Sequence, residues 1–273
     1  MAAEEAAGHA HQVGEHWTWT LSSQPINFGP LNLQTVHADT LVATWIVMAF
    51  LILVGFWFAG GVSHSPTRKQ STIESVVEFL EDLVKGQIGP TAVQYLGYIS
   101  SLFLFVWACN WFGMLPWRAP AHFTGAPELM APTADLNTTA ALALMTLGLY
   151  FVSGCRKMGV AGYLAHHFTE PPLPTKTWLG FVASLPLRLL FTVLNLMEHL
   201  TRPLSLAMRL FGNISAEEIV GTVLLMLAPW LLPLPLMALG LLVGVIQAFV
   251  FAFLTTAYIG MAVAEHGTHE EAH

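Results

Sequence analysis

The sequence predicts an all-α integral membrane protein, with about five membrane helices and one amphipathic helix at the membrane surface. Of the 273 residues, 55% are hydrophobic and only 10% are charged, whereas soluble domains carry about 25% charged residues. Apolar stretches of about 20 residues, the length that crosses a bilayer, recur along the chain. We divide it into an outer-side tail (1–36), a single transmembrane domain (37–264) and a cytoplasmic tail (265–273).

The membrane helices are expected at 37–62, 93–117, 136–153, 178–228 and 234–264. The second contains tryptophans near its end, as segments that reach the membrane interface do. The last two lie in a region that is too long for one crossing, and no Asp, Glu, Lys or Arg occurs between 219 and 264. Because prolines interrupt this region at 228–235, we expect two long helices joined as a hairpin.

Residues 71–88, between the first two membrane helices, predict an amphipathic helix. Its apolar residues share one face at helical spacing, and its charged residues fall elsewhere. The apolar set is Ile73, Val76, Val77, Leu80, Leu83 and Val84. Ser71 and Glu74 have the spacing of a capping box, which would begin the helix there. Such a helix lies on the membrane surface or packs as an ordinary helix against its neighbours.

The basic residues of the loops predict the orientation of the chain. They follow the first and the third membrane helices: Arg68, Lys69, Lys85, Arg156, Lys157 and Lys176. Only Arg118 lies on the opposite side, and neither tail has Lys or Arg. The positive-inside rule then places the N-terminus outside and, after an odd number of crossings, the C-terminus in the cytoplasm.

Several classes of function lack support in the sequence. The two cysteines, Cys109 and Cys155, are isolated, whereas a disulfide framework or a zinc site needs more cysteines at defined spacing. The histidines of both tails suggest solvated tails rather than a metal site. No basic patch suggests nucleic acid, and no nucleophile–base motif suggests catalysis. We therefore expect no cofactor, no metal and no enzymatic activity of the chain on its own.

The stretch "PLSLAMRLFGN" places Arg209 among apolar residues, with no acid three or four positions away. An arginine cannot shed its charge, and a charge at membrane depth is costly and marks function by default. At about 100° per residue, one helix face carries Glu198, Arg202, Ser205, Arg209 and Asn213. Glu217 falls at the edge of that face, and Glu218 points away from Arg209. Glu198 and Arg202 are either a simple ion pair or part of the function.

Two other groups of polar residues lie near membrane helices. Gly240, Gly244 and Gln247 share one face of the last helix, where the glycines predict close helix packing. Gln247 is a lone amide in a charge-free helix, and we expect Arg209 to donate a hydrogen bond to it. Asp135 and Asn137 open the third membrane helix on the outer side, where helix capping explains them without any further role.

The stretch "TRPLSLAMRLFGNISAEEIV", followed by "IQAFVFAFLTTAYIG", closely resembles the a subunit of F-type ATP synthases. Two further stretches, "APELMAPTADLNTTAALAL" and "IGPTAVQYLGYISSLFLFVWACNWFGMLPW", match the same family, so the likeness covers most of the chain from His37 onward. The resemblance implies two long tilted helices against a ring of c subunits, with the peripheral-stalk b subunits, other synthase subunits and lipid as further partners. It also implies proton transport through two offset half-channels, in a bacterial cytoplasmic or a thylakoid membrane.

The resemblance assigns roles to single residues. Arg209 matches the essential arginine that faces the ring. The other matching residues fall along the proton path, and Ser205 joins them because it lies on the face of Arg209. The matching residues are Glu218, Glu217, Asn213, Gln247, Asp135, Asn137 and Glu198. Some family members carry His or Glu at the position of Gly240, so a proton relay is missing here and Glu217 could replace it. Sodium as the coupling ion, and a self-contained channel or transporter, are the alternatives; an intramembrane hydrolase would need a nucleophile motif.

Overall fold

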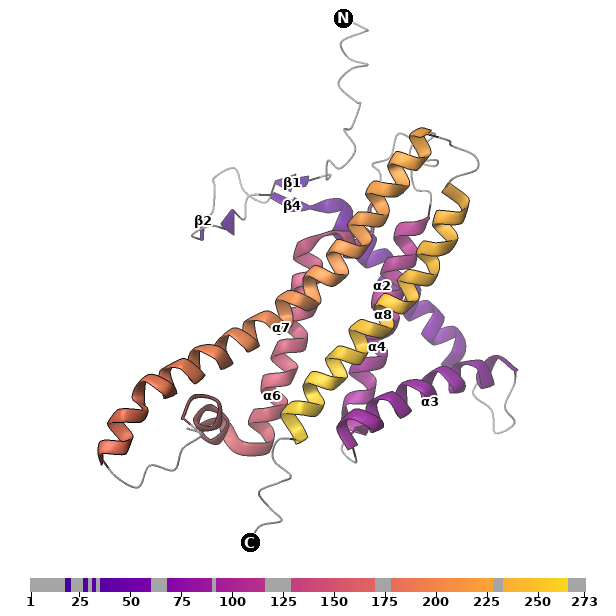
Figure 1. The fold of residues 1–273 in the computed structure, drawn as a ribbon. Coiled ribbons are helices and arrows are strands. Elements are labelled where there is room, and N and C mark those ends of the chain that lie inside the picture. The colour runs from indigo at the N-terminus through magenta and orange to yellow at the C-terminus, as the bar shows by residue number, and fades with distance from the viewer. Residues whose placement is uncertain are drawn as a thin grey trace, which may run out of the picture.

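The computed structural model describes residues 18–20, 27–28, 31–32, 35–59, 68–89, 92–115, 129–169, 178–227 and 233–264. Helices dominate these residues (Figure 1). They are α2 (Ala38–Ala59), α3 (Arg68–Ile88), α4 (Val93–Met114), the short 3-10 helix η2 (Pro132–Ala134), α6 (Leu136–Thr169), α7 (Trp178–Leu227) and α8 (Pro233–Ala264). The histidines at the two ends of the chain lie outside the described residues.

Four of the described helices are long and apolar enough to cross a membrane. The stretches are Ala38–Phe58, Val93–Met114, Leu136–Lys157 and Leu234–Val263. Helical structure together with these apolar lengths confirms a helical integral membrane protein. The much longer α7 spans 50 residues and contains Pro186 and Pro203. A fifth crossing through α7, and a hairpin of α7 and α8, stay predictions.

Short strands precede α2, in the region that we expected to be a tail. Strand β1 (Thr18–Thr20) pairs antiparallel with β4 (Thr35–His37), and β2 (Asn27–Phe28) pairs with β3 (Leu31–Asn32). Because β4 runs directly into α2, His37 lies immediately before the first turn of that helix.

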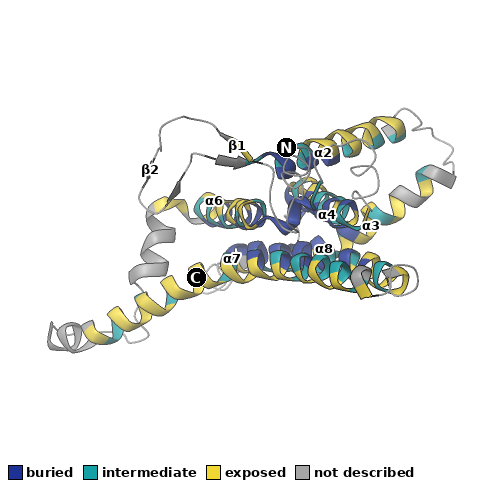
Figure 2. Cartoon of the chain, turned by 90° about the horizontal axis from the view of Figure 1, so that it is seen from above, coloured by how far each residue is buried: buried dark blue, intermediate teal, exposed yellow. Residues whose placement is uncertain are grey.

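The helices pack in layers when the molecule is seen from above (Figure 2). Helices α7 and α8 lie side by side in one layer, with their buried sides toward α4 and α6. The largest cluster of buried side chains joins α3, α4, α6, α7 and α8, and α2 packs mainly on α4. The opposite side of the α7–α8 layer is exposed.

Helix α3 begins one turn earlier than the capping-box spacing predicted. Ser71 therefore lies inside the helix, where its carbonyl accepts a hydrogen bond from the Ser75 hydroxyl. Glu74 accepts a hydrogen bond from Gln70 instead of capping Ser71. The apolar face of the helix is real: Leu80 and Val84 are each 1% exposed. This face packs against α4 and α8, so α3 is a packed helix as well as an amphipathic one.

Helix α6 begins where Asp135 caps it. The Asp135 carboxylate accepts the backbone N–H of Asn137 at 2.8 Å, and its carbonyl accepts that of Thr139 at 3.2 Å. This is the pattern by which an N-cap residue satisfies the free N–H groups of the first turn. The helical segment continues beyond 153 to Thr169, with a break at Gly159, whose φ is 75°.

Candidate functional site

Arg209 lies on the exposed side of α7, in a nearly apolar stripe. Its neighbours in this stripe include Leu204 (61% exposed), Met208 (48%) and Ile219 (65%). The opposite side of α7 is buried in the protein at Leu206, Ala207, Leu210 and Ile214. Among the residues that the structure describes, Arg209 has no hydrogen-bond or ion-pair partner. Its charge therefore faces outward, away from the core of its own chain.

Helix α8 continues the same exposed surface beside α7 (Figure 2). Leu239, Leu242 and Ile246 are 51–59% exposed. We call the exposed sides of α7 and α8 together the Arg209 face. It offers a broad apolar surface that carries the charge of Arg209, and no Lys or Arg follows Arg209 in the sequence.

The expected hydrogen bond from Arg209 to Gln247 is wrong. Gln247 is only 8% exposed, whereas Arg209 is on the exposed side of α7. The amide nitrogen of Gln247 is buried without a hydrogen-bond partner in the described part of the chain. Atoms of the same kind occur on α7 at Asn213 and Glu217, and on α8 at Thr255. Buried polar atoms are normally bonded to protein or to ordered water, so these two helices carry polar groups that need an outside partner.

Glu217 stands next to Gly240, the position at which the family resemblance indicated a missing relay. A β-carbon added at Gly240 would lie 3.5 Å from Cδ of Glu217, and 2.8 Å from Sδ of Met114. The carboxyl group thus occupies space beside α8 that a larger residue at 240 would share. Ser205 lies on the exposed side of α7.

Glu218 contacts the segment before η2. One of its carboxylate oxygens accepts the backbone N–H of Ala131 at 3.3 Å, and Ala131 and Ala134 pack against Ile214. Because η2 is followed directly by Asp135, this contact links α7 to the beginning of α6.

Asp135 is buried and is the centre of a hydrogen-bonded group that we call the Asp135 cluster: His37, Thr40, Asp135 and Asn137. The carboxylate accepts hydrogen bonds from the His37 ring (2.7 Å), the Thr40 hydroxyl (3.1 Å) and the side-chain amide of Asn137 (3.0 Å), besides the capping bond. Burial alone would raise the pKa of Asp135. The hydrogen bonds from Asn137, His37 and Thr40 outweigh it, so the pKa lies below its ordinary value.

A second chain of buried hydrogen bonds joins η2, α4 and α8. The Thr133 hydroxyl donates to Oδ1 of Asn110 at 2.9 Å, and Nδ2 of Asn110 donates to the carbonyl oxygen of Gly244 at 3.1 Å. Trp111 also donates to α8, at the Leu241 carbonyl (3.1 Å). These bonds fix α8 against α4 within two turns of Gln247.

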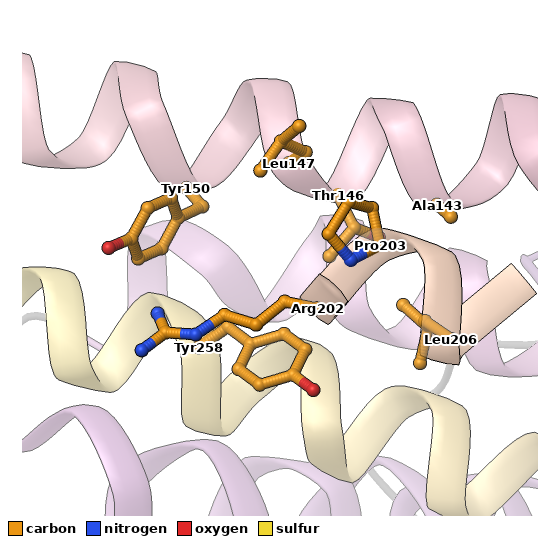
Figure 3. A pocket seen from close by; sticks show the side chains of 8 residues that line it. All are labelled: Ala143, Thr146, Leu147, Tyr150, Arg202, Pro203, Leu206 and Tyr258. Carbon is orange, nitrogen blue, oxygen red and sulfur yellow. The ribbon is translucent and has the colours of Figure 1, made fainter. Parts of the chain in front are cut away.

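Glu198 forms an ion pair with Arg202 on α7, which was one of the two expected possibilities. The guanidinium of Arg202 also lies near the rings of Tyr150 on α6 and Tyr258 on α8 (Figure 3). Sequence reasoning placed Tyr258 on roughly the side of Gln247, but it did not single out Tyr150, His37, Asn110 or Thr133. Asn110 alone had a visible signal, since it is an amide far inside an apolar helix, as Gln247 is.

The fold and the site together define a helical integral membrane protein whose exposed apolar face carries an arginine without a partner among the described residues. Comparison with known proteins gives the family. The sequence matches the ATP synthase A chain family over residues 41–260. It is 41% identical over 263 residues to the ATP synthase subunit a of Gloeobacter violaceus. The aligned residues cover 95% of this chain and 94% of that protein. The chain therefore belongs to the ATP synthase A chain family.

Proposed function

We propose that this chain is the proton-conducting a subunit of an F-type ATP synthase, the static partner of a rotating ring of c subunits. Membership of the family supports the proposal. The observation that carries it is the exposed Arg209 in an apolar surface, with no partner in the part of the chain that the structure describes. A charge at membrane depth is costly unless a partner meets it, and a ring that bears carboxylates supplies such a partner.

Arg209 acts on the ring by electrostatics. A nearby cation favours the ionised form of a carboxylate, so each ring carboxylate releases its proton when it reaches Arg209. The same charge opposes the direct passage of cations from one half-channel to the other. Lysine is a poor substitute because a buried ammonium deprotonates readily, whereas a guanidinium does not.

Protons enter on the outer side and leave on the cytoplasmic side. Asp135 and Asn137 stand at the entrance, followed by Glu218, Glu217, Asn213 and Gln247, and the exit passes Ser205 and Glu198. The buried unpaired atoms of Asn213, Glu217 and Gln247 support the inner part of this entrance path, because water or a passing proton carrier would satisfy them.

The remaining surfaces follow from this role. The Arg209 face meets the c ring, whereas lipid, the peripheral-stalk b subunits and other synthase subunits cover the rest. The N-terminus lies on the outer side and the C-terminus in the cytoplasm of a bacterium or on the equivalent side of a thylakoid. The chain performs no catalysis by itself, since ATP is made or hydrolysed elsewhere in the complex.

The test is ATP-driven proton pumping by the assembled complex in inverted membrane vesicles. Arg209→Ala should abolish pumping, and Arg209→Lys should fail as well. Ser101→Ala, at an exposed position of α4 where the hydroxyl donates to the Tyr98 carbonyl of the same helix, serves as the control and should pump like the wild type. Substantial pumping by Arg209→Ala would refute the proposed role.

The same vesicles decide between the two carboxylates. If Glu217 relays protons in place of a side chain at 240, Glu217→Gln should slow pumping at least as much as Glu218→Gln. A normal rate in Glu217→Gln with a slow rate in Glu218→Gln would assign the relay to Glu218 alone.

A further inference from the structure

Arg202 joins three helices through its guanidinium. On α7 itself, Nη2 pairs with the Glu198 carboxylate. The guanidinium carbon lies 5.6 Å from the ring centre of Tyr150 on α6 and 5.5 Å from that of Tyr258 on α8 (Figure 3). Both distances are within the range of a cation–π interaction. We call these four residues the Arg202 clamp.

The two rings stabilise the Arg202 cation in addition to its pairing with Glu198. Nη1 of Arg202 is buried without a hydrogen-bond partner among the described residues. The Arg202 side chain is only 17% exposed, so water satisfies little of its charge. Ring faces carry negative electrostatic potential, which strengthens when the cation is desolvated. The clamp is therefore specific for a cation rather than for any long side chain.

The clamp lies at the weakest turn in this part of α7. Pro203 follows Arg202 directly and lies inside the helix. It has no N–H to donate to the carbonyl of His199, four residues earlier, and such a gap makes a helix easy to bend. Contacts from α6 surround the same turn, because Tyr150 hydrogen-bonds His199 at 3.3 Å and Phe151 stacks on its ring at 5.5 Å.

Arg209 is seven residues beyond Arg202, which is two turns or about 10.5 Å along the helix. A change in the direction of α7 at Pro203 would therefore displace Arg209 relative to α8. We propose that Arg202 is a positioning residue: its guanidinium, held between Tyr150 and Tyr258, fixes the course of α7 through Pro203 and thereby the place of Arg209. This inference rests on the proposed role of Arg209.

The test compares matched variants of the assembled complex in inverted vesicles. For each variant, protons pumped per ATP hydrolysed are measured, and the amount of assembled complex is measured separately. Arg202→Lys keeps a cation between the rings, because the Glu198 carboxylate and the ring faces favour the charged form of an ammonium at this position, whereas Arg202→Met keeps the length without the charge. The Arg202→Lys variant should retain most of the coupling ratio. The Arg202→Met variant should have a coupling ratio about tenfold lower than the wild type, because its desolvated cation–π contacts are removed.

A purely structural role would lower the amount of complex and leave the coupling ratio of the remaining complexes unchanged. That result, or an equal loss of coupling in the Lys and Met variants, would overturn the proposal. If Arg202→Met fails to assemble, Tyr258 decides: Tyr258→Phe keeps the ring face and should couple normally, whereas Tyr258→Leu should uncouple. Equal coupling in the two Tyr258 variants would also overturn it.

The role of Arg209 is tested independently. Arg209→Lys should fail although Arg202→Lys works, because only Arg209 meets the ring. Pumping by Arg209→Ala would refute the proposed function itself, whereas failure of Arg209→Ala with no contrast in the Arg202 and Tyr258 series would refute the positioning role alone.

Discussion

Thr133→Val and Asn110→Leu should show that the buried hydrogen bonds between η2, α4 and α8 stabilise the fold as a unit. Thr133 is 0% and Asn110 is 1% exposed, so water does not replace a lost partner. Thr133→Val keeps the shape and removes one bond, which is worth about 0.6–1.7 kcal/mol between helices in a membrane protein. Asn110→Leu removes the bonds to Thr133 and to Gly244, and should cost about 1–3 kcal/mol.

The assay is a double-mutant cycle on the free energy of unfolding, measured by denaturing-detergent titration of the purified chain in mixed micelles. Because both single variants break the same Thr133–Asn110 bond, the double variant should cost less than their sum, by about 0.6–1.7 kcal/mol. Thr256→Val is the control, since its hydroxyl bonds only a carbonyl of its own helix, that of Ala252. Strict additivity of Thr133→Val and Asn110→Leu would refute the network.

Two further predictions concern packing and pH. Gly260→Ala should destabilise the chain by about 1–3 kcal/mol, because its β-carbon would lie 2.6 Å from the backbone oxygen of Gln87. Gly240→Ala should cost less in the same titration, because its close contacts are with the flexible end of Met114 and Glu217 is at an ordinary van der Waals distance. Asp135→Asn should lower the thermal stability of the complex at pH 7. Because the folded-state pKa of Asp135 is depressed, its contribution is complete above about pH 4 and is lost as the pH falls through the folded pKa. The difference in melting temperature should therefore shrink below pH 4, and a difference that grows there would contradict the assignment.

Local periodicity predicted much of the fold and the stripe of Arg209. A helix repeat places Arg209 and Ser205 on one side whatever surrounds them, and both are exposed. Apolar length likewise indicated the membrane helices, because few other structures use such stretches. The capping-box start of α3 failed because Gln70 offers Glu74 a competing partner within the helix.

Contacts between distant segments could not be predicted in this way. The Arg209–Gln247 bond failed because the rotation of one helix against another sets such pairs, and no local pattern encodes it. For the same reason the sequence could not predict the bond between His37 and Asp135, which are 98 residues apart. Nor could it predict that two tyrosine rings lie beside the Arg202 guanidinium. Asn110 could have been singled out by the reasoning applied to Gln247, although its partners could not.

The central claim is that Arg209 is held free of its own chain in order to meet carboxylates of another. A density map of the assembled complex tests this most directly, through the surroundings of the Arg209 guanidinium. We expect the Arg209 face to lie against the c ring, with a ring carboxylate near Arg209 and no acid of this chain paired with it. An Arg209 side chain paired with Glu217 or Glu218, or facing lipid away from the ring, would contradict it.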